Sequence, residues 1–383
     1  AATIQKAADN NINLLRGESK YDDIRFDTVI VDEAARANPP DLLIPMSQAV
    51  KRIILVGDHR QLPHIIEEEV LKRNELEFKQ AQNSGGDSDG GEPPFLLNPK
   101  ILRHSLFQHL WENLEKKHRT ITLNIQFRMH PLLGNFVSRY FYKMQGDSGF
   151  DSGLEPSSCK HGLQDIKTEG LYEPNLEKKA LVWFDVQGEK DKSDGSRYRE
   201  CEATALVAKL KSWMDSEAGR GLSFGIITFY RSQVREINSA LDRIGIGIHA
   251  DKGEFRDEYK YLPPEEGEVA RKERLQVGTV DAFQGKEFDV VLLSLVHSSA
   301  PGKKIAENAD GIKLFNRICT SEETNASKNL LCVALSRQKK LLAVFGDRRL
   351  FASKAAEKHS RELHQLLKLS DVENNGDLCD YEL

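Results

Sequence analysis

The sequence predicts an α/β protein whose strands form parallel sheets. In the second half of the chain, short apolar runs alternate with helical patterns, which is typical of a parallel sheet covered on both faces. In the first half, two strand-like runs each end in a cluster of polar residues. With 383 residues, the chain is long enough for two domains with cores of their own.

The first domain is expected over residues 1–150. It opens with strand-like runs at 26–31 and 52–56, rich in valine and isoleucine. Residues 80–92 are polar and glycine-rich and predict a flexible surface loop. Apolar residues at helical spacing, or a charged helical pattern, predict helices at 67–79, 101–117 and 132–142.

The second domain is expected over residues 151–369. Residues 250–273 and 298–325 have the composition of inserted loops, and the acidic tail 370–383 is expected to be disordered. The spacing of apolar residues and the length of each segment predict strands at 180–186, 223–229, 275–280, 289–296 and 340–346. The same features predict helices at 200–216, 231–243, 327–337 and 356–367.

Composition excludes several classes of protein. The sequence has no apolar run of about 18 residues and no secretory signal, so neither a membrane span nor secretion is expected. Its five cysteines lack paired spacing, which argues against a disulfide framework or a zinc site and for the reducing cytoplasm. The net charge of −5 is mild evidence against strong nonspecific nucleic-acid binding, but it permits a local basic groove.

Two adjacent carboxylates, Asp32 and Glu33, directly follow the first strand-like run. A nucleoside-triphosphate hydrolase needs such a pair: one acid holds Mg²⁺, and the other orients or deprotonates the attacking water. For an isolated hit, the alternative is a strand that simply ends in solvent.

The second strand-like run ends in Gly57, and Gln61 follows four residues later. Glycine permits a tight exit from the strand, and a glutamine amide can contact both a phosphate and a water. His59 and His64 lack a third ligand at metal-binding spacing, so surface or packing roles are favoured for them.

Five motifs occur in a characteristic order along the chain. They are Asp32–Ala35, Gly57–His64, Gln126–Pro131, Gly278–Glu287 and Val333–Arg337. The series resembles the later motifs of superfamily 1 helicases, in particular the nonsense-mediated-decay group and its bacterial relatives, over about residues 1–350. The resemblance implies two tandem RecA-like domains, with ATP bound in the cleft between them and a single strand of RNA or DNA crossing both.

The resemblance also implies roles in hydrolysis. Asp32 would hold Mg²⁺, Glu33 would be the catalytic base and Gln61 would sense the γ-phosphate. Arg128 and Arg337, in different halves of the chain, would reach the phosphates from the two sides of the cleft, so that hydrolysis depends on its closure. The alternative for each arginine is a structural ion pair.

Three residues are implied to contact the rest of the nucleotide. Gly285 would let the backbone approach it, and Glu287 would reach its ribose. Phe127 stands where the family often has tyrosine; its ring can still stack on a base and loses only the hydroxyl.

Five further residues are implied to hold the nucleic-acid strand: Thr279, Asp281, Gln284, Tyr230 and Arg231. Such contacts position a strand without reading its sequence. Structural alternatives stay open, because threonine is common in strands and aspartate commonly caps helices. The family commonly has proline at Phe229, so the match around Tyr230 is imperfect.

The phosphate-binding loop, Gly-x-x-x-x-Gly-Lys-Ser/Thr, does not occur in the sequence. In the family it lies upstream of the Asp–Glu strand. We therefore expect a carboxy-terminal fragment whose first RecA-like domain is truncated at its amino terminus. By itself it would hydrolyse ATP poorly, because the phosphates lose their main ligands.

Three functions fit these observations. The first is an ATP-dependent helicase or translocase with ATP and Mg²⁺ as cofactors. The second is a nucleic-acid clamp that is switched by nucleotide without unwinding. The third is a non-catalytic assembly fragment. The first is favoured by the set Asp32, Glu33, Gln61, Arg128, Glu287 and Arg337, because a clamp that never hydrolyses has no need of a catalytic base.

Overall fold

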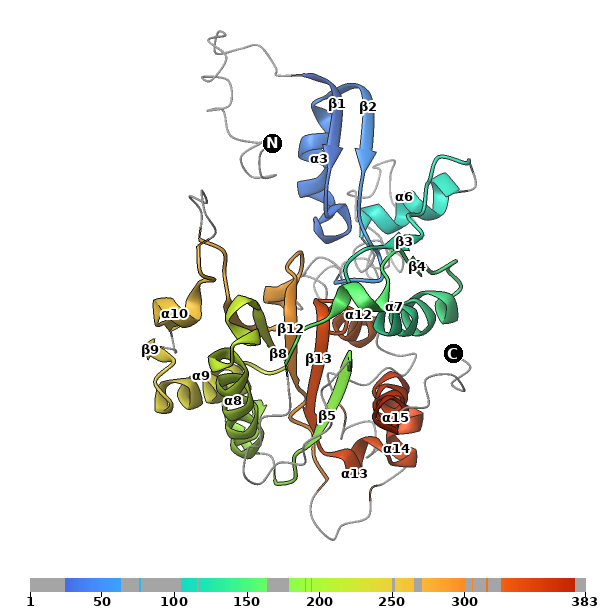
Figure 1. Cartoon of the computed structure of the whole chain (residues 1–383). Coiled ribbons are helices and arrows are strands. Elements are labelled where there is room, and N and C mark those ends of the chain that lie inside the picture. Colours follow the sequence, from blue (N-terminus) through green and yellow to red (C-terminus); the bar gives the residue numbers. More distant parts are fainter. Residues whose placement is uncertain are drawn as a thin grey trace. The chain divides into compact units, whose positions relative to one another are not determined.

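The computed structural model of the chain divides into two compact units, Ala1–Thr122 and Leu123–Leu383 (Figure 1). Each unit is described separately below. The structure describes residues 25–62, 76, 105–115, 117–163, 179–189, 191–193, 195–249, 252–264, 271–299, 305, 315 and 325–375.

In the first unit, β1 (Phe26–Val31) and β2 (Ala49–Leu55) form a parallel pair. Their β-branched residues explain the strands, and α3 (Pro39–Ser47) makes the crossover between them. The Asn38 side chain caps α3 by accepting a hydrogen bond of 2.8 Å from the amide of Asp41. A short helical turn, η1 (Ala34–Arg36), and α6 (Leu106–Glu115) complete the described part of this unit.

The second unit is built on a five-stranded sheet in the order β11-β8-β12-β13-β5. Every neighbouring pair is parallel, which confirms the predicted parallel α/β sheet. Its strands are β5 (Leu181–Asp185), β8 (Phe224–Thr228), β11 (Leu275–Thr279), β12 (Phe288–Ser294) and β13 (Gln338–Gly346).

Helices cover both faces of this sheet (Figure 1). On one face, α8 (Glu200–Asp215) and α9 (Arg231–Arg243) bury Val290 and Leu292 of β12 in a common core. On the other face, the ring of Trp183 packs edge-on against Phe351, with centroids 5.4 Å apart. That face also carries α12 (Asn325–Ala334), α13 (Arg348–Phe351), α14 (Lys354–His359) and α15 (Arg361–Asn375).

A small pair of parallel strands, β3 (Ile125–Gln126) and β4 (Asp151–Ser152), also belongs to the second unit. The chain between them forms α7 (Pro131–Val137) and the wider turn η2 (Ser138–Tyr142). The remaining described strands and helices are η3 (Lys143–Gln145), η4 (Pro156–Cys159), β6 (Asp191–Ser193), β7 (Ser196–Tyr198), η5 (Ala218–Gly221), β9 (Gly247–His249), β10 (Glu254–Phe255), α10 (Asp257–Lys260) and η7 (Val280–Phe283).

The structure differs from the sequence expectations in three places. The units divide after Thr122, so residues 123–150, which were expected in the first domain, belong to the second unit. The helix expected at 356–367 is two helices that meet at Ser360, where the backbone leaves the helical region. The second of them, α15, continues to Asn375, into the tail that was expected to be disordered.

Some expectations lie outside the described residues. These are the loop 80–92, the helix 67–79 apart from Leu76, and most of the insertion 298–325. Part of the insertion 250–273 is described and contains β10 and α10. Within the described residues, no helix has the length and apolar character that crossing a membrane requires.

Candidate functional site

Asp32 and Glu33 lie exposed at the carboxyl end of β1. The amide of Glu33 donates a hydrogen bond of 2.9 Å to Oδ1 of Asp32. Glu33 adopts a left-handed conformation with φ 53°, which turns the chain sharply into η1. The next amide, of Ala34, bonds to the carbonyl of Val56 at 2.8 Å. The two acids are therefore presented on a turn that is tied to the neighbouring strand.

Gln61 is held by Asp58, just beyond β2. Its Nε2 donates a hydrogen bond of 2.9 Å to Oδ2 of Asp58. Gly57 lets this segment pass close to the first turn, because a Cβ on Gly57 would come within 2.9 Å of the backbone nitrogen of Ala35. Since β1 and β2 are parallel, Gln61 follows the same edge of the pair as Asp32 and Glu33.

The acids at this edge suit Mg²⁺ in the manner usual for nucleotide sites. Mg²⁺ is commonly bound through one or two carboxylates, with waters and phosphates as its other ligands. In the described part of the chain, no three histidine, cysteine or acidic residues group closely enough to hold a metal ion by themselves. Asp32 fits the role of a single carboxylate ligand.

In the second unit, Arg128 and Glu287 form an ion pair of 2.7 Å between Nε and Oε2. The other carboxylate oxygen of Glu287, Oε1, lies 2.7 Å from Nζ of Lys339. Partial burial would raise the pKa of Glu287, but the hydrogen bonds from Lys339 and Arg128 outweigh it and hold the pKa below its usual value. The carboxylate therefore lies ionised between two cations.

Arg337 lies beside this group and is buried. It directly precedes β13, and its carbonyl accepts a hydrogen bond from the amide of Phe288 at the start of β12. Its guanidinium donates to the carbonyls of Val333 at 3.1 Å and Lys286 at 3.4 Å. Arg128 and Arg337 thus share one unit, whereas the sequence analysis expected them on opposite sides of a cleft.

Gly285 lies in the crossover from β11 to β12, with φ 76°. This positive φ favours glycine, because a residue with a Cβ is strained in that conformation. Upstream in the crossover, Phe283 packs on β8 and β11, where Cβ atoms on Gly225 and Gly278 would press on its ring. A short segment, anchored by the buried ring of Phe283, therefore connects Thr279 at the carboxyl edge of the sheet with Glu287 at the amino edge.

The ring of Phe127 rests on the backbone of Gly153. The amide of Gly153 donates to the carbonyl of Gln126 at 2.8 Å, which extends the β3–β4 pairing by one residue. A Cβ at position 153 would overlap the Phe127 ring. The side chain of Phe127 nevertheless remains 69% exposed, so it has the character of a stacking platform.

Most of the residues expected to hold nucleic acid lie at or just beyond the carboxyl edge of the sheet. Thr279 pairs with Thr228 at the ends of β11 and β8. Asp281 and Arg231 are exposed there, at the starts of η7 and α9, and Gln284 is half-buried.

Tyr230 lies away from solvent, although the sequence analysis expected it to contact nucleic acid. Its ring is buried, and its hydroxyl lies 2.7 Å from Nε2 of His297. His297 follows β12 and is itself fully buried. In this structure Tyr230 joins the ends of β8 and β12, and Arg231 is the exposed residue of the pair.

Sequence reasoning missed Lys339, Gly153 and His297. The sequence could have pointed to Lys339, because it is a lysine two residues after Arg337, a candidate phosphate-binding residue. Gly153 and His297 carry none, because their roles arise from contacts with residues distant in sequence.

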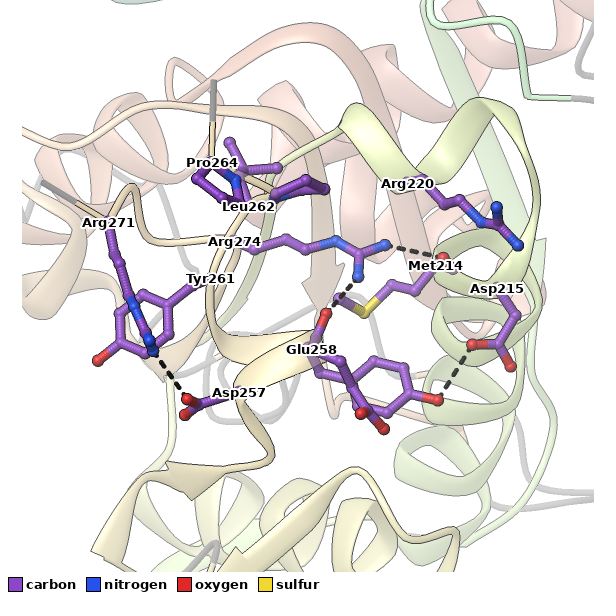
Figure 2. A pocket seen from close by; sticks show the side chains of 12 residues that line it. Met214, Asp215, Arg220, Asp257, Glu258, Tyr261, Leu262, Pro264, Arg271 and Arg274 are labelled. Carbon is purple, nitrogen blue, oxygen red and sulfur yellow. Dashed lines mark hydrogen bonds and ion pairs between the residues drawn. The ribbon is translucent and has the colours of Figure 1, made fainter. Parts of the chain in front are cut away.

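One pocket of the second unit, of about 660 Å³, lies away from these residues (Figure 2). It lies between the end of α8, α10 and the segment that leads into β11. The terminal nitrogens of Arg274 donate to the carbonyls of Glu258, Met214 and Gly219 at 2.6–3.0 Å. None of the expected site residues lines this pocket, and Arg274 serves there to join the surrounding segments.

The parallel α/β sheet is the fold expected of a superfamily 1 helicase. Residues 102–349 match a family model described as "AAA domain", and residues 1–69 match a second model with the same description. The chain belongs to this AAA domain family, in its branch of nonsense-mediated-decay-type superfamily 1 helicases.

Similar curated proteins carry helicase names. A "Regulator of nonsense transcripts 1 homolog" of Neurospora crassa is 25% identical over 74% of this chain. "ATP-dependent helicase NAM7" of Saccharomyces cerevisiae is 26% identical over 72%, and "Helicase sen1" of Schizosaccharomyces pombe is 28% identical over 73%. The chain spans 21%, 23% and 13% of the length of these relatives, respectively.

Proposed function

We propose that the whole protein is an ATP-dependent helicase or translocase that acts on single-stranded or partly duplex RNA or DNA. The observation that carries this proposal is the gathering of Arg128, Glu287 and Arg337 at the amino edge of the second sheet. The acids of the first unit supply the complementary chemistry. The family and the names of the relatives support the same activity.

Hydrolysis would use residues of both units. Asp32 would hold Mg²⁺, which neutralises charge on the phosphates when bound. Glu33 would accept a proton from the attacking water, which Gln61 would orient by its amide. Arg128 and Arg337 would meet the phosphates, and Phe127 and Glu287 would contact the base and the ribose.

Coupling to nucleic acid would run through the crossover that contains Phe283 and Gly285. Thr279 and Asp281 lie at the end of the crossover that would face the strand, Gln284 lies within the crossover, and Glu287 lies at its other end. Because Phe283 is fully buried against β8 and β11, the crossover would move as a unit with the sheet. Contacts from these residues and Arg231 to the backbone would grip a strand without reading its sequence.

We place the protein in the cytoplasm. The described cysteines, Cys159, Cys201 and Cys332, are free thiols, which persist in a reducing compartment.

The test is ATP hydrolysis by the full-length protein, with and without single-stranded RNA and DNA, beside a Glu33→Gln variant. We expect stimulation by one or both polymers and loss of turnover in the variant. Stimulated turnover without strand displacement would define a translocase. Nucleotide-dependent binding of the polymer without turnover would instead establish the clamp.

A further inference from the structure

Lys339 lies outside the five sequence motifs, and the role proposed for it rests on the proposed function of Arg128 and Glu287. We propose that Glu287 holds Arg128 between turnovers, and that Lys339 is the positioning residue that keeps Glu287 in place when Arg128 turns to the nucleotide phosphates.

Lys339 is aimed at Glu287 by an irregularity in the sheet. Phe288 pairs with Gln338 and Val290 pairs with Leu341, so Asp289 alone lies opposite both Lys339 and Lys340. This is a β-bulge, a device that re-aims side chains and is common beside active sites. Nζ of Lys339 lies 2.7 Å from Oε1 of Glu287, and Nζ of Lys340 lies 3.2 Å from Oδ1 of Asp289.

The ion pair between Arg128 and Glu287 is weak enough for Arg128 to leave Glu287 and bind phosphate instead. The two side chains are 34% and 42% exposed, and ion pairs with this access to water are weak. Within the described part of the chain, only Nε of the Arg128 guanidinium has a hydrogen-bond partner. The two terminal nitrogens can therefore take phosphate oxygens in the bidentate manner that arginine favours.

Withdrawal of Arg128 would leave Glu287 with one cation. A carboxylate without any cation would repel the incoming phosphates and would no longer be held in place. Lys339 binds the oxygen that Arg128 does not use, so its contact survives the exchange. Glu287 would then stay neutralised and correctly placed beside the ribose.

The chain supplies a matched control. Lys340 occupies the same bulge and carries the same charge, but it pairs with Asp289. That carboxylate otherwise accepts hydrogen bonds from the backbone and hydroxyl of Ser223. Lys340→Gln therefore removes one positive charge one residue away without touching Glu287.

The experiment measures binding of a fluorescent ADP analogue to the full-length protein, together with KM and kcat for ATP. We expect Lys339→Gln to raise Kd and KM about fivefold with a smaller change in kcat. Lys339→Arg should restore both constants, and Lys340→Gln should leave them unchanged. In a Glu287→Gln background, Lys339→Gln should have no further effect.

Two outcomes would overturn the inference. One is an equal effect of Lys339→Gln and Lys340→Gln on Kd and KM, which would show that the loss of any nearby positive charge is enough. The other is an effect of Lys339→Gln that persists in the Glu287→Gln background, which would mark a direct contact with nucleotide. Absence of nucleotide binding by the unmodified protein would instead refute the proposed function, so the two failures are distinguishable.

Discussion

Arg128 and Glu287 stand 159 positions apart in the chain and are joined by an ion pair of 2.7 Å. The segment with Arg128 is anchored by the pairing of β3 with β4, and Glu287 precedes β12 in the central sheet. The pair thus connects two motifs that the sequence analysis assigned to different domains. In the proposed function, both residues act on the same nucleotide.

Arg128→Ala should slow hydrolysis far more than it weakens nucleotide binding. Arginines that meet the transferring phosphate are worth about 10³-fold or more in kcat. Steady-state kinetics of the full-length protein would measure this, with Arg139→Ala, on the neighbouring helical turn, as a control. A fall in kcat no larger than that of the control would contradict the role of Arg128.

Gly153→Ala should weaken recognition of the base. The added methyl group would displace the Phe127 ring that rests on Gly153. We expect a KM for ATP raised by about threefold to tenfold with kcat largely kept, since stacking on a base is worth about 1–3 kcal/mol.

Gly153→Ala should also reduce the preference of the protein for purine over pyrimidine triphosphates, because stacking on the Phe127 ring favours the larger base. Competition between ATP and CTP would measure it. Gly146→Ala is a matched substitution in the same unit with no atom within 4 Å of its added Cβ, although its φ of 92° adds local strain. Equal losses in both variants would indicate a general effect on folding.

His130 should make stability depend on pH. Burial and then the neighbouring His161 lower the pKa of His130 from 6.5 to about 4, and its Nδ1 accepts the amide of Leu132 at the start of α7. The neutral ring is therefore favoured in the folded state. Its contribution is fully present above pH 6.5 and is lost as pH falls towards 4.

His130→Asn keeps a capping side chain but cannot titrate in this range. Denaturant unfolding at several pH values should show a flatter profile for this variant between pH 6.5 and 4. His249→Asn, an exposed position, should retain the profile of the unmodified protein. An unchanged profile in the His130 variant would assign the pH dependence to other groups.

Glu202→Ala should destabilise the second unit strongly. Glu202 is fully buried, pairs with Arg199 at 2.6 Å and accepts the amide of Val296, a residue with an unfavourable φ of 66°. Removing one member of a buried pair costs about 3–5 kcal/mol, because the other charge remains buried.

Thermal or denaturant unfolding would measure this loss against Glu236→Ala, which breaks an exposed pair with Arg243 worth about 1 kcal/mol or less. If the two variants unfold alike, the buried network does not hold the end of β12.

The sequence by itself determined the strands of the five-stranded sheet and the residues that are candidates for chemistry. Runs such as Phe224–Thr228 and Phe288–Ser294 are apolar along their whole length, so they predict buried parallel strands without knowledge of their neighbours. The motifs could also be recognised from the sequence, because each is a short local pattern. Asp32, Gln61 and Arg337 lie next to strands, at positions defined by local patterns of a few residues.

Only the tertiary structure decided which of these residues meet. The division after Thr122, the burial of Tyr230 against His297 and the bulge that turns Lys339 towards Glu287 depend on strand register and packing. Hydrophobic periodicity indicates which face of a helix or strand is buried, but it does not indicate which other element packs against that face. Contacts between distant segments arise only when the whole sheet is assembled.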